Sequence, residues 1–191
     1  MKEYFTFLLI LLMGTLAFSQ TGTSAVNLES FEKSGFPFKG KRVIQVDNVY
    51  TPSEENMFVF SKNEKGAAQD SLYIQQFKKS GDEWKLAAEK IIAEKGIITA
   101  TWNSRKAFFD ADKDGVADVL YIFARHAKED METPLSVGLL LIYKNNFYVI
   151  ENTADANYDP QLDIYEAGFE ELPKAVIDTV EEFWEGLDKQ H

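Results

Sequence analysis

The chain has 191 residues, a formal net charge of −11, 14% aromatic residues and no cysteine. An acidic surface disfavours nucleic acid and anionic lipid headgroups as partners. Without cysteine there can be no disulfide, and two unpaired histidines do not make a zinc centre. The aromatic content argues against disorder and is sufficient for one sizeable hydrophobic core.

Residues 1–19 have the pattern of a secretory signal peptide. Lys2 precedes an apolar run from Phe5 to Met13, and small residues then lead to an expected cleavage after Ser19. The alternative, a membrane anchor, needs about 20 apolar residues, which is more than this run provides. We therefore expect export to the periplasm or the cell exterior, with no membrane span after cleavage. Cleavage removes one Lys and one Glu, so the net charge stays at −11.

The rest of the chain predicts one α+β domain. Residues 20–35 are expected to form a lead-in segment with a short helix at 28–34, and residues 36–191 a single β-rich domain. Strands are expected at 42–49, 57–60, 71–78, 83–88, 97–102, 106–109, 119–125, 139–143 and 147–151. Turn signals at 79–82 and 144–146 join neighbouring strands directly, which predicts a mostly antiparallel β-sheet of about seven to nine strands.

Only the carboxy-terminal end has a clear helical pattern. Pro173 suits a first helical turn, and apolar residues recur at helical spacing from Val176 to Leu187. Phe183 and Trp184 are candidates for a ligand platform, but an apolar stripe of this kind is more often a packing surface. We expect this C-terminal helix to pack on the sheet.

Residues 110–118 have the spacing of a calcium-binding loop. The predicted ligands are Asp110, Asp112 and Asp114 at the first, third and fifth positions, the Val116 carbonyl at the seventh and Asp118 at the ninth. Gly115 at the sixth position permits the positive φ of a sharp turn. A hard divalent cation requires such converging oxygen ligands. The loop therefore predicts a structural calcium ion.

Three other interpretations of the loop fit less well. An EF-hand would carry a Glu at the twelfth position, where this chain has Tyr121 inside an apolar run, so strands are expected on both sides. A bare hairpin turn would leave four carboxylates repelling one another, with only Lys113 inside the loop to offset them. Magnesium demands octahedral geometry and retains several waters. Without the Glu, calcium affinity is expected on the order of 10⁻⁴ to 10⁻³ M.

No catalytic constellation emerges from the sequence. His126 and His191 are the only histidines, and His126 is interpreted as a surface or strand-end residue. A glycosidase needs only two carboxylates, and the segment 152–166 contains Asp155, Asp159, Asp163 and Glu166. We interpret that segment as a solvated loop and expect no catalytic residue, while keeping a small glycan hydrolase as an alternative.

Two stretches of the chain resemble known families. The stretch 109–120 resembles the calcium loop of the FG-GAP and VCBS repeats of integrin-type β-propellers, although a single loop in about 170 mature residues excludes a complete propeller. The longer stretch 108–187 contains the Asp-rich loop, the apolar runs 119–123, 139–143 and 148–150, and a closing segment from Leu172-Pro173 to Phe183-Trp184. This order is similar to an uncharacterised family of small exported Bacteroidetes proteins that is linked by name to surface polysaccharide biosynthesis. This resemblance implies an exported accessory protein.

The sequence thus predicts an exported, non-catalytic, calcium-loop-bearing binding or accessory protein of the periplasm or cell surface. Its expected partners are polysaccharide or an envelope protein. A small glycan-acting hydrolase and an inhibitor or immunity-like protein, whose acidic surface would suit a basic target, stay open as alternatives.

Overall fold

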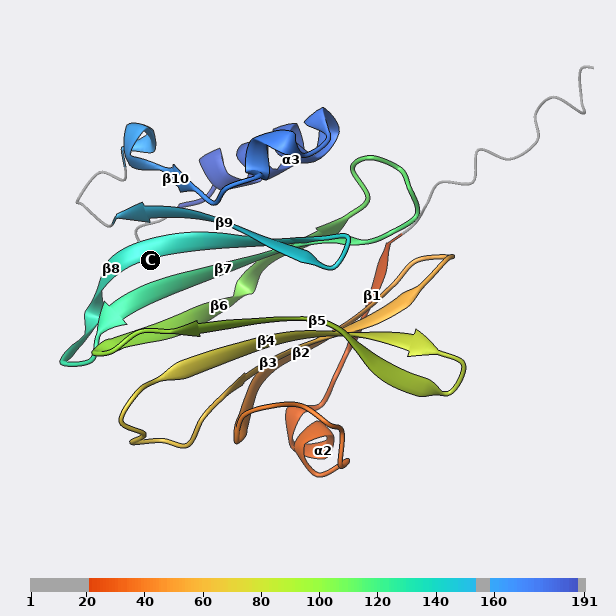
Figure 1. Ribbon diagram of the computed structural model, residues 1–191, viewed down its shortest axis with the longest axis horizontal. Coiled ribbons are helices and arrows are strands. Elements are labelled where there is room, and N and C mark those ends of the chain that lie inside the picture. The colour runs from red at the N-terminus through yellow and green to blue at the C-terminus, as the bar shows by residue number, and fades with distance from the viewer. Residues whose placement is uncertain (1–20, 154–158, 189–191) are drawn as a thin grey trace, which may run out of the picture.

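The computed structural model describes residues 21–153 and 159–188, so the predicted signal peptide lies outside the described residues. Within these ranges, ten strands form two five-stranded antiparallel sheets that lie face to face (Figure 1). The expectation of a mostly antiparallel fold with a C-terminal helix is confirmed. The expected strand count of about seven to nine was too low, and the strands divide between two sheets.

Sheet A contains the first half of the chain in the order β1-β2-β3-β4-β5. Its strands are β1 (Gly22–Ala25), β2 (Arg42–Tyr50), β3 (Glu55–Lys62), β4 (Ser71–Ser80) and β5 (Glu83–Ala93), and helix α2 (Leu28–Glu32) lies between the first two. Strand β1 was not predicted, because four small, polar residues carry no alternation of apolar side chains. The expected lead-in segment therefore extends the sheet by pairing with β2.

Sheet B contains the second half in the order β10-β9-β8-β7-β6. Its strands are β6 (Ile97–Phe109), β7 (Asp118–Ala127), β8 (Asp130–Tyr143), β9 (Asn146–Thr153) and β10 (Ile164–Tyr165). Two 3₁₀ helices, η2 (Pro160–Leu162) and η3 (Phe169–Glu171), precede helix α3 (Lys174–Glu185). The two expected strands at 97–102 and 106–109 are one strand, whose pairing with β7 shifts register between Thr101 and Lys106.

The fold has four layers, with α2 and α3 on the outer faces of the two sheets (Figure 1). Between the sheets, Phe58 and Phe60 of β3 pack with Tyr121 and Phe123 of β7. On the outer face of sheet B, the C-terminal helix contributes a stripe of three buried side chains, Val176, Val180 and Trp184. The packing interpretation of this helix is therefore confirmed for Trp184, which is only 2% exposed.

Sheet B is covered by sheet A on one face and by α3 on the other, which explains why the apolar runs in its strands are continuous. Strands β7 and β8 are buried on both faces, since alternate residues face sheet A and α3. On the outer face of sheet A, Phe31 of α2 packs with Phe36 and Phe77. Among the described residues, the helices are too short or too polar to cross a membrane.

The strand connections gather at two opposite ends of the sandwich. At the loop end lie the β2–β3 turn (51–54), the Asp-rich loop between β6 and β7, and the β8–β9 turn. At the far end lie the β3–β4 connection (63–70), the β5–β6 connection (94–96) and the β7–β8 turn (128–129). Because antiparallel strands reverse at each turn, each end combines segments that are distant in the sequence.

Candidate metal-binding loop

The Asp-rich loop connects β6 to β7, so strands flank it on both sides as the sequence predicted. Gly115 has φ of +84°, in the region that favours glycine, and Lys113 also has a positive φ of 58°. Such backbone angles turn the chain sharply. The predicted sixth-position turn is therefore present.

Three of the predicted ligands converge. Asp110, Asp112 and Asp114 each offer a carboxylate oxygen that lies within 4.8 Å of the others. Asp110 accepts hydrogen bonds from the backbone N–H of Asp114 at 3.0 Å and of Gly115 at 3.1 Å. Asp114 accepts one from the Val116 N–H at 2.8 Å. These bonds fold the loop and hold its carboxylates close together, whereas a role for the Val116 carbonyl stays a prediction.

Asp118 lies at the start of β7, outside that close group, and is fully buried. One of its oxygens accepts the Ala111 N–H at 3.1 Å, whereas no donor among the described residues reaches Oδ1. Burial raises the pKa of this carboxyl to about 7, and the charges of Asp112, Asp114 and Asp110 add to the effect. A buried carboxylate beside three others is electrostatically unfavourable unless a cation offsets its charge.

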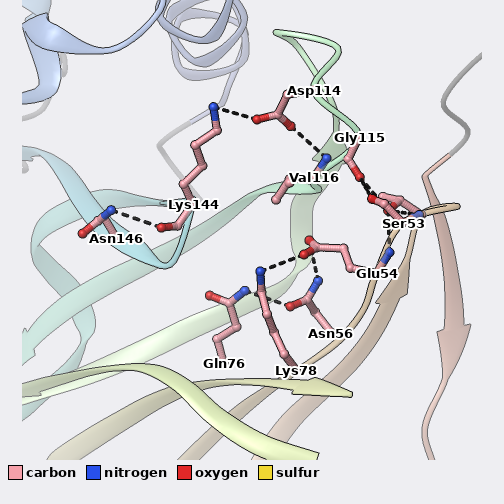
Figure 2. A network of polar contacts seen from close by, with 11 residues as sticks. Ser53, Glu54, Asn56, Gln76, Lys78, Asp114, Gly115, Val116, Lys144 and Asn146 are labelled. Atoms are coloured by element: carbon pink, nitrogen blue, oxygen red, sulfur yellow. Dashed lines mark hydrogen bonds and ion pairs between the residues drawn. The ribbon is translucent and has the colours of Figure 1, made fainter. Parts of the chain in front are cut away.

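Lys144, in the β8–β9 turn, supplies part of the positive charge that the loop requires. Its Nζ lies 2.6 Å from an Asp114 oxygen and 3.2 Å from an Asp112 oxygen, as Figure 2 shows for Asp114. Tyr143 also donates to Asp112 at 2.8 Å. The hydrogen bond to Asp114 is the main reason that the pKa of Lys144 is raised. Burial acts to raise the pKa of Asp112, but the hydrogen bonds from Tyr143 and Lys144 outweigh it and lower that pKa.

Lys144 was not predicted as a partner of the loop. Lys144 and Asn145 have φ of 48° and 64°, so they form the tight turn that the sequence did predict. A turn signal carries no information about which other loop lies beside it. Only the β7–β8–β9 order of sheet B brings this turn to the Asp-rich loop.

The loop is also tied to sheet A. The Gly115 carbonyl accepts a hydrogen bond from Thr51 Oγ1 at 2.7 Å and another from Ser53 Oγ (Figure 2). Both hydroxyls belong to the β2–β3 turn. The Asp-rich loop therefore connects the two sheets at the loop end, a contact that no local pattern could reveal.

A polar network continues from that turn into sheet A (Figure 2). Glu54 accepts from Asn56 Nδ2 at 2.8 Å and pairs with Lys78 Nζ at 2.7 Å. Gln76 Nε2 donates to Asn56 Oδ1 at 2.9 Å. Asn56 is fully buried, so this network satisfies groups that would otherwise be costly to bury.

A second polar cluster links the sheets farther from the loop. Asp47 of β2 is 8% exposed, pairs with Lys106 of β6, and accepts hydrogen bonds from Gln45 at 2.6 Å and from the Tyr121 hydroxyl at 3.2 Å. Burial, followed by the charge of Asp47, raises the pKa of Tyr121. This cluster was not predicted, because its members come from three strands.

His126 lies near the end of β7, as predicted, but it is 8% exposed and therefore buried rather than on the surface. Its opposite neighbours in the sheet are Ile98 of β6 and Pro134 of β8.

In the acidic segment, the described residues 152–153 and 159–166 are more structured than a solvated loop, and Asp155 lies outside the described residues. Asp159 caps η2 by accepting the Gln161 N–H at 3.0 Å. Asp163 accepts the indole N–H of Trp184 at 2.8 Å, and Glu166 pairs with Lys90 at 2.9 Å. These three carboxylates therefore make structural contacts.

Comparison with protein-family models, with curated proteins and with solved structures gives no match to this chain. The resemblances to propeller calcium loops and to exported Bacteroidetes proteins therefore stay predictions, and functional inference depends on the site.

Proposed function

We propose that the Asp-rich loop binds one calcium ion, which would hold the two sheets together in a non-catalytic binding or accessory protein of the cell envelope. The observation that carries the proposal is the fully buried Asp118, whose Oδ1 has no donor among the described residues beside three converging carboxylates. Several oxygen ligands that converge in this way suit a hard cation such as calcium. The ligands would be the carboxylates of Asp110, Asp112, Asp114 and Asp118, together with the Val116 carbonyl.

Lys144 would act as a resident counter-ion in competition with calcium. Its ammonium contacts two of the loop carboxylates, but one positive charge cannot neutralise four carboxylates. A divalent ion has twice the charge and accepts several oxygens at once. Displacing Lys144 costs the hydrogen bonds that it makes, which supports the modest affinity, on the order of 10⁻⁴ to 10⁻³ M, expected for an extracellular module.

A structural role follows from where the loop is fixed. Its Gly115 carbonyl is held by two hydroxyls of sheet A, whereas its carboxylates belong to sheet B. An ion that orders the loop would strengthen this connection between sheets. The absence of cysteine is compatible with such a role, since a chain without disulfides relies on core packing and on any ion that binds its folded state.

Calorimetry and thermal unfolding test the calcium site. At calcium about 100-fold above the dissociation constant, the expected stabilisation is about 2.7 kcal/mol, reversed by chelator. Asp112→Asn should abolish most of this gain, whereas the charge-matched control Asp82→Asn, in the exposed β4–β5 turn, should retain it. Absence of binding heat at millimolar calcium, together with a melting temperature indifferent to chelator, refutes the proposal.

The envelope location has an independent test. The signal-peptide pattern and the resemblance to exported proteins support it. Mass spectrometry of the protein recovered from producing cells should find an amino terminus at Gln20 in the envelope or exported fraction. A full-length chain retained in the cytoplasm contradicts export without bearing on calcium.

The alternative glycan hydrolase has one structural observation in its favour. A hollow of about 370 Å³ near β10 and α3 is lined by Tyr165, Phe169, Glu170, Ile177 and Glu181. Two carboxylates beside aromatic rings are the minimum for glycosidase chemistry. Sugar release from an acidic glycan that is lost in both Glu170→Gln and Glu181→Gln would establish the hydrolase. No release by the unmodified protein would exclude it for that glycan.

A further inference from the structure

A basic pocket lies at the far end of the sandwich, opposite the Asp-rich loop. Its volume is about 280 Å³, and segments of the β3–β4, β5–β6 and β7–β8 connections line it. Strand β6 begins at this pocket with Ile97 and ends at the Asp-rich loop with Phe109. The far-end pocket therefore shares no residue with the proposed calcium site.

Positive charge predominates in this pocket although the chain as a whole has a net charge of −11. Four cations line it, Arg42, Lys62, Lys65 and Lys128, against two carboxylates, Glu64 and Asp70. Lys62 and Asp70 neutralise each other at 2.6 Å. No carboxylate in the described chain forms a salt bridge with Arg42, Lys65 or Lys128. The remaining excess of positive charge would attract an anion.

The innermost cation is held in a fixed position. Lys62 is 8% exposed, and its partner Asp70 also accepts the Thr99 N–H at 3.3 Å. Thr99 belongs to β6, so this contact joins sheet A to sheet B beneath the pocket. An ammonium group has three N–H donors, and Asp70 is the only carboxylate that forms a salt bridge with Lys62 in the described chain.

The walls of the pocket are also tied together. Arg42 Nε donates to the Asn63 carbonyl at 3.0 Å, and the Asn63 side chain donates to the Gln69 carbonyl. On the other side, the Lys128 N–H donates to the Gly96 carbonyl at 2.9 Å. Because these bonds exist without ligand, binding would require little ordering of the backbone.

The remaining lining is small or apolar. Gly66, Ala67 and Ala68 leave the backbone of the β3–β4 connection accessible, and Ile97 and Ile98 are half-buried. A volume of 280 Å³ corresponds to several waters at about 30 Å³ each, which is enough for a single sugar-sized molecule. Such a ligand would place its C–H face on the isoleucines and its charge at the cationic rim.

We propose that the far-end pocket binds one sugar-sized molecule that carries a single carboxylate or phosphate. The proposal deepens the binding role proposed above by naming a ligand class. It depends on the cations, the small lining residues and the volume of the pocket. It does not depend on the calcium loop.

Calorimetry with glucuronate, glucose 6-phosphate and neutral glucose tests this assignment and separates the two sources of the anion. We expect saturable binding of at least one charged sugar at a ratio of one per chain. Lys65→Glu and Lys128→Glu should each weaken it about tenfold, since a hydrogen bond to a charged group contributes about 1.5 kcal/mol or more. The matched control is Lys85→Glu, an exposed lysine of β5 outside the pocket, which should leave affinity within a factor of two.

NMR spectra of the backbone amides provide a second measurement, which does not depend on the heat of binding. Binding should shift the backbone N–H signals of Gly66 and Gly96, while that of Gly115 at the opposite end stays in place. No saturable binding of either charged sugar at 10 mM, on the order of a weak metabolite affinity, overturns the proposal. Equal binding of neutral glucose, or equal weakening in the Lys85→Glu control, also overturns it. Because the titrations run in chelator as well as in calcium, failure here is distinguishable from failure of the calcium site.

Discussion

Replacing Asp118 by Asn should stabilise the protein when calcium is absent. The pKa of this buried carboxyl is about 7, whereas a carboxyl in an unfolded chain ionises near 3.8. Each pKa unit corresponds to 1.36 kcal/mol, so holding the charged form in the folded state costs about 4 kcal/mol above pH 7, as an upper bound. Asparagine avoids this cost, and its Oδ1 can still accept the Ala111 N–H.

The pH dependence has a definite sign. At about pH 3 and below, the carboxyl is largely protonated in both states and the penalty is absent. As pH rises from about 4 to 7, the unfolded state loses its proton and the folded state does not, so the stability of the natural protein falls. Above pH 7 the full penalty applies. In chelator, the stability advantage of Asp118→Asn should therefore grow between pH 4 and pH 7 and then level off.

Urea unfolding in chelator at several pH values measures this difference, with Asp82→Asn as the charge-matched control. Calcium at 1 mM should narrow this difference by about 1.4 kcal/mol if the dissociation constant is about 10⁻⁴ M, because the cation stabilises the Asp118 carboxylate and the variant loses that ligand. The reasoning is refuted if Asp118→Asn is less stable than the natural protein in chelator at pH 8. It is equally refuted if the difference between the two proteins is the same at pH 4 and pH 8.

Three further substitutions have expected outcomes. Lys144→Met should bind calcium more tightly in calorimetry and be less stable in chelator, since it removes the competing ammonium; unchanged affinity would exclude that competition. Gly115→Ala should lower the free energy of unfolding by about 1–2 kcal/mol in urea, because φ is +84° and the added Cβ lies 3.3 Å from Ser53 Oγ. An unchanged free energy of unfolding would contradict this backbone angle. Trp184→Ala should lower the free energy of unfolding by about 3–5 kcal/mol and leave Asp163 without its indole donor. Trp184→Phe is the control, since it also removes the donor but keeps an aromatic ring, so its loss should be smaller. Similar losses in both variants would show that packing is not the main contribution.

The sequence predicts those parts of this fold that depend on local patterns. Strand β4 follows an alternation in which Leu72, Ile74 and Gln76 share one face, and all three are buried. The Lys144-Asn145 turn is similarly local, since both residues adopt the positive φ that a tight hairpin requires. In contrast, β10 is two residues long and has no period to detect. The division into two sheets was not predictable, because the connection at Gly96 has the same signal as a hairpin turn.

In the candidate site too, the features within one short segment were predictable and the contacts between segments were not. The spacing of Asp110, Asp112 and Asp114 is a property of one short segment, and their carboxylates converge as expected. Lys144 and Ser53 reach the loop from turns that follow other strands, so their contacts depend on strand order within and between sheets. Pairwise contacts of this kind leave no pattern in a single sequence.

The calcium loop and the far-end pocket should act independently, although strand β6 connects them. Coupling between sites requires an element with two arrangements whose equilibrium both ligands shift. The pocket is held by its own hydrogen bonds, from Arg42 to Asn63 and from Lys128 to Gly96, none of which involves the loop. The dissociation constant of the charged sugar should therefore agree within a factor of two in saturating calcium and in chelator, measured by calorimetry at constant ionic strength. A tenfold difference, about 1.4 kcal/mol of coupling free energy, would show that the two sites are coupled and would refute their independence.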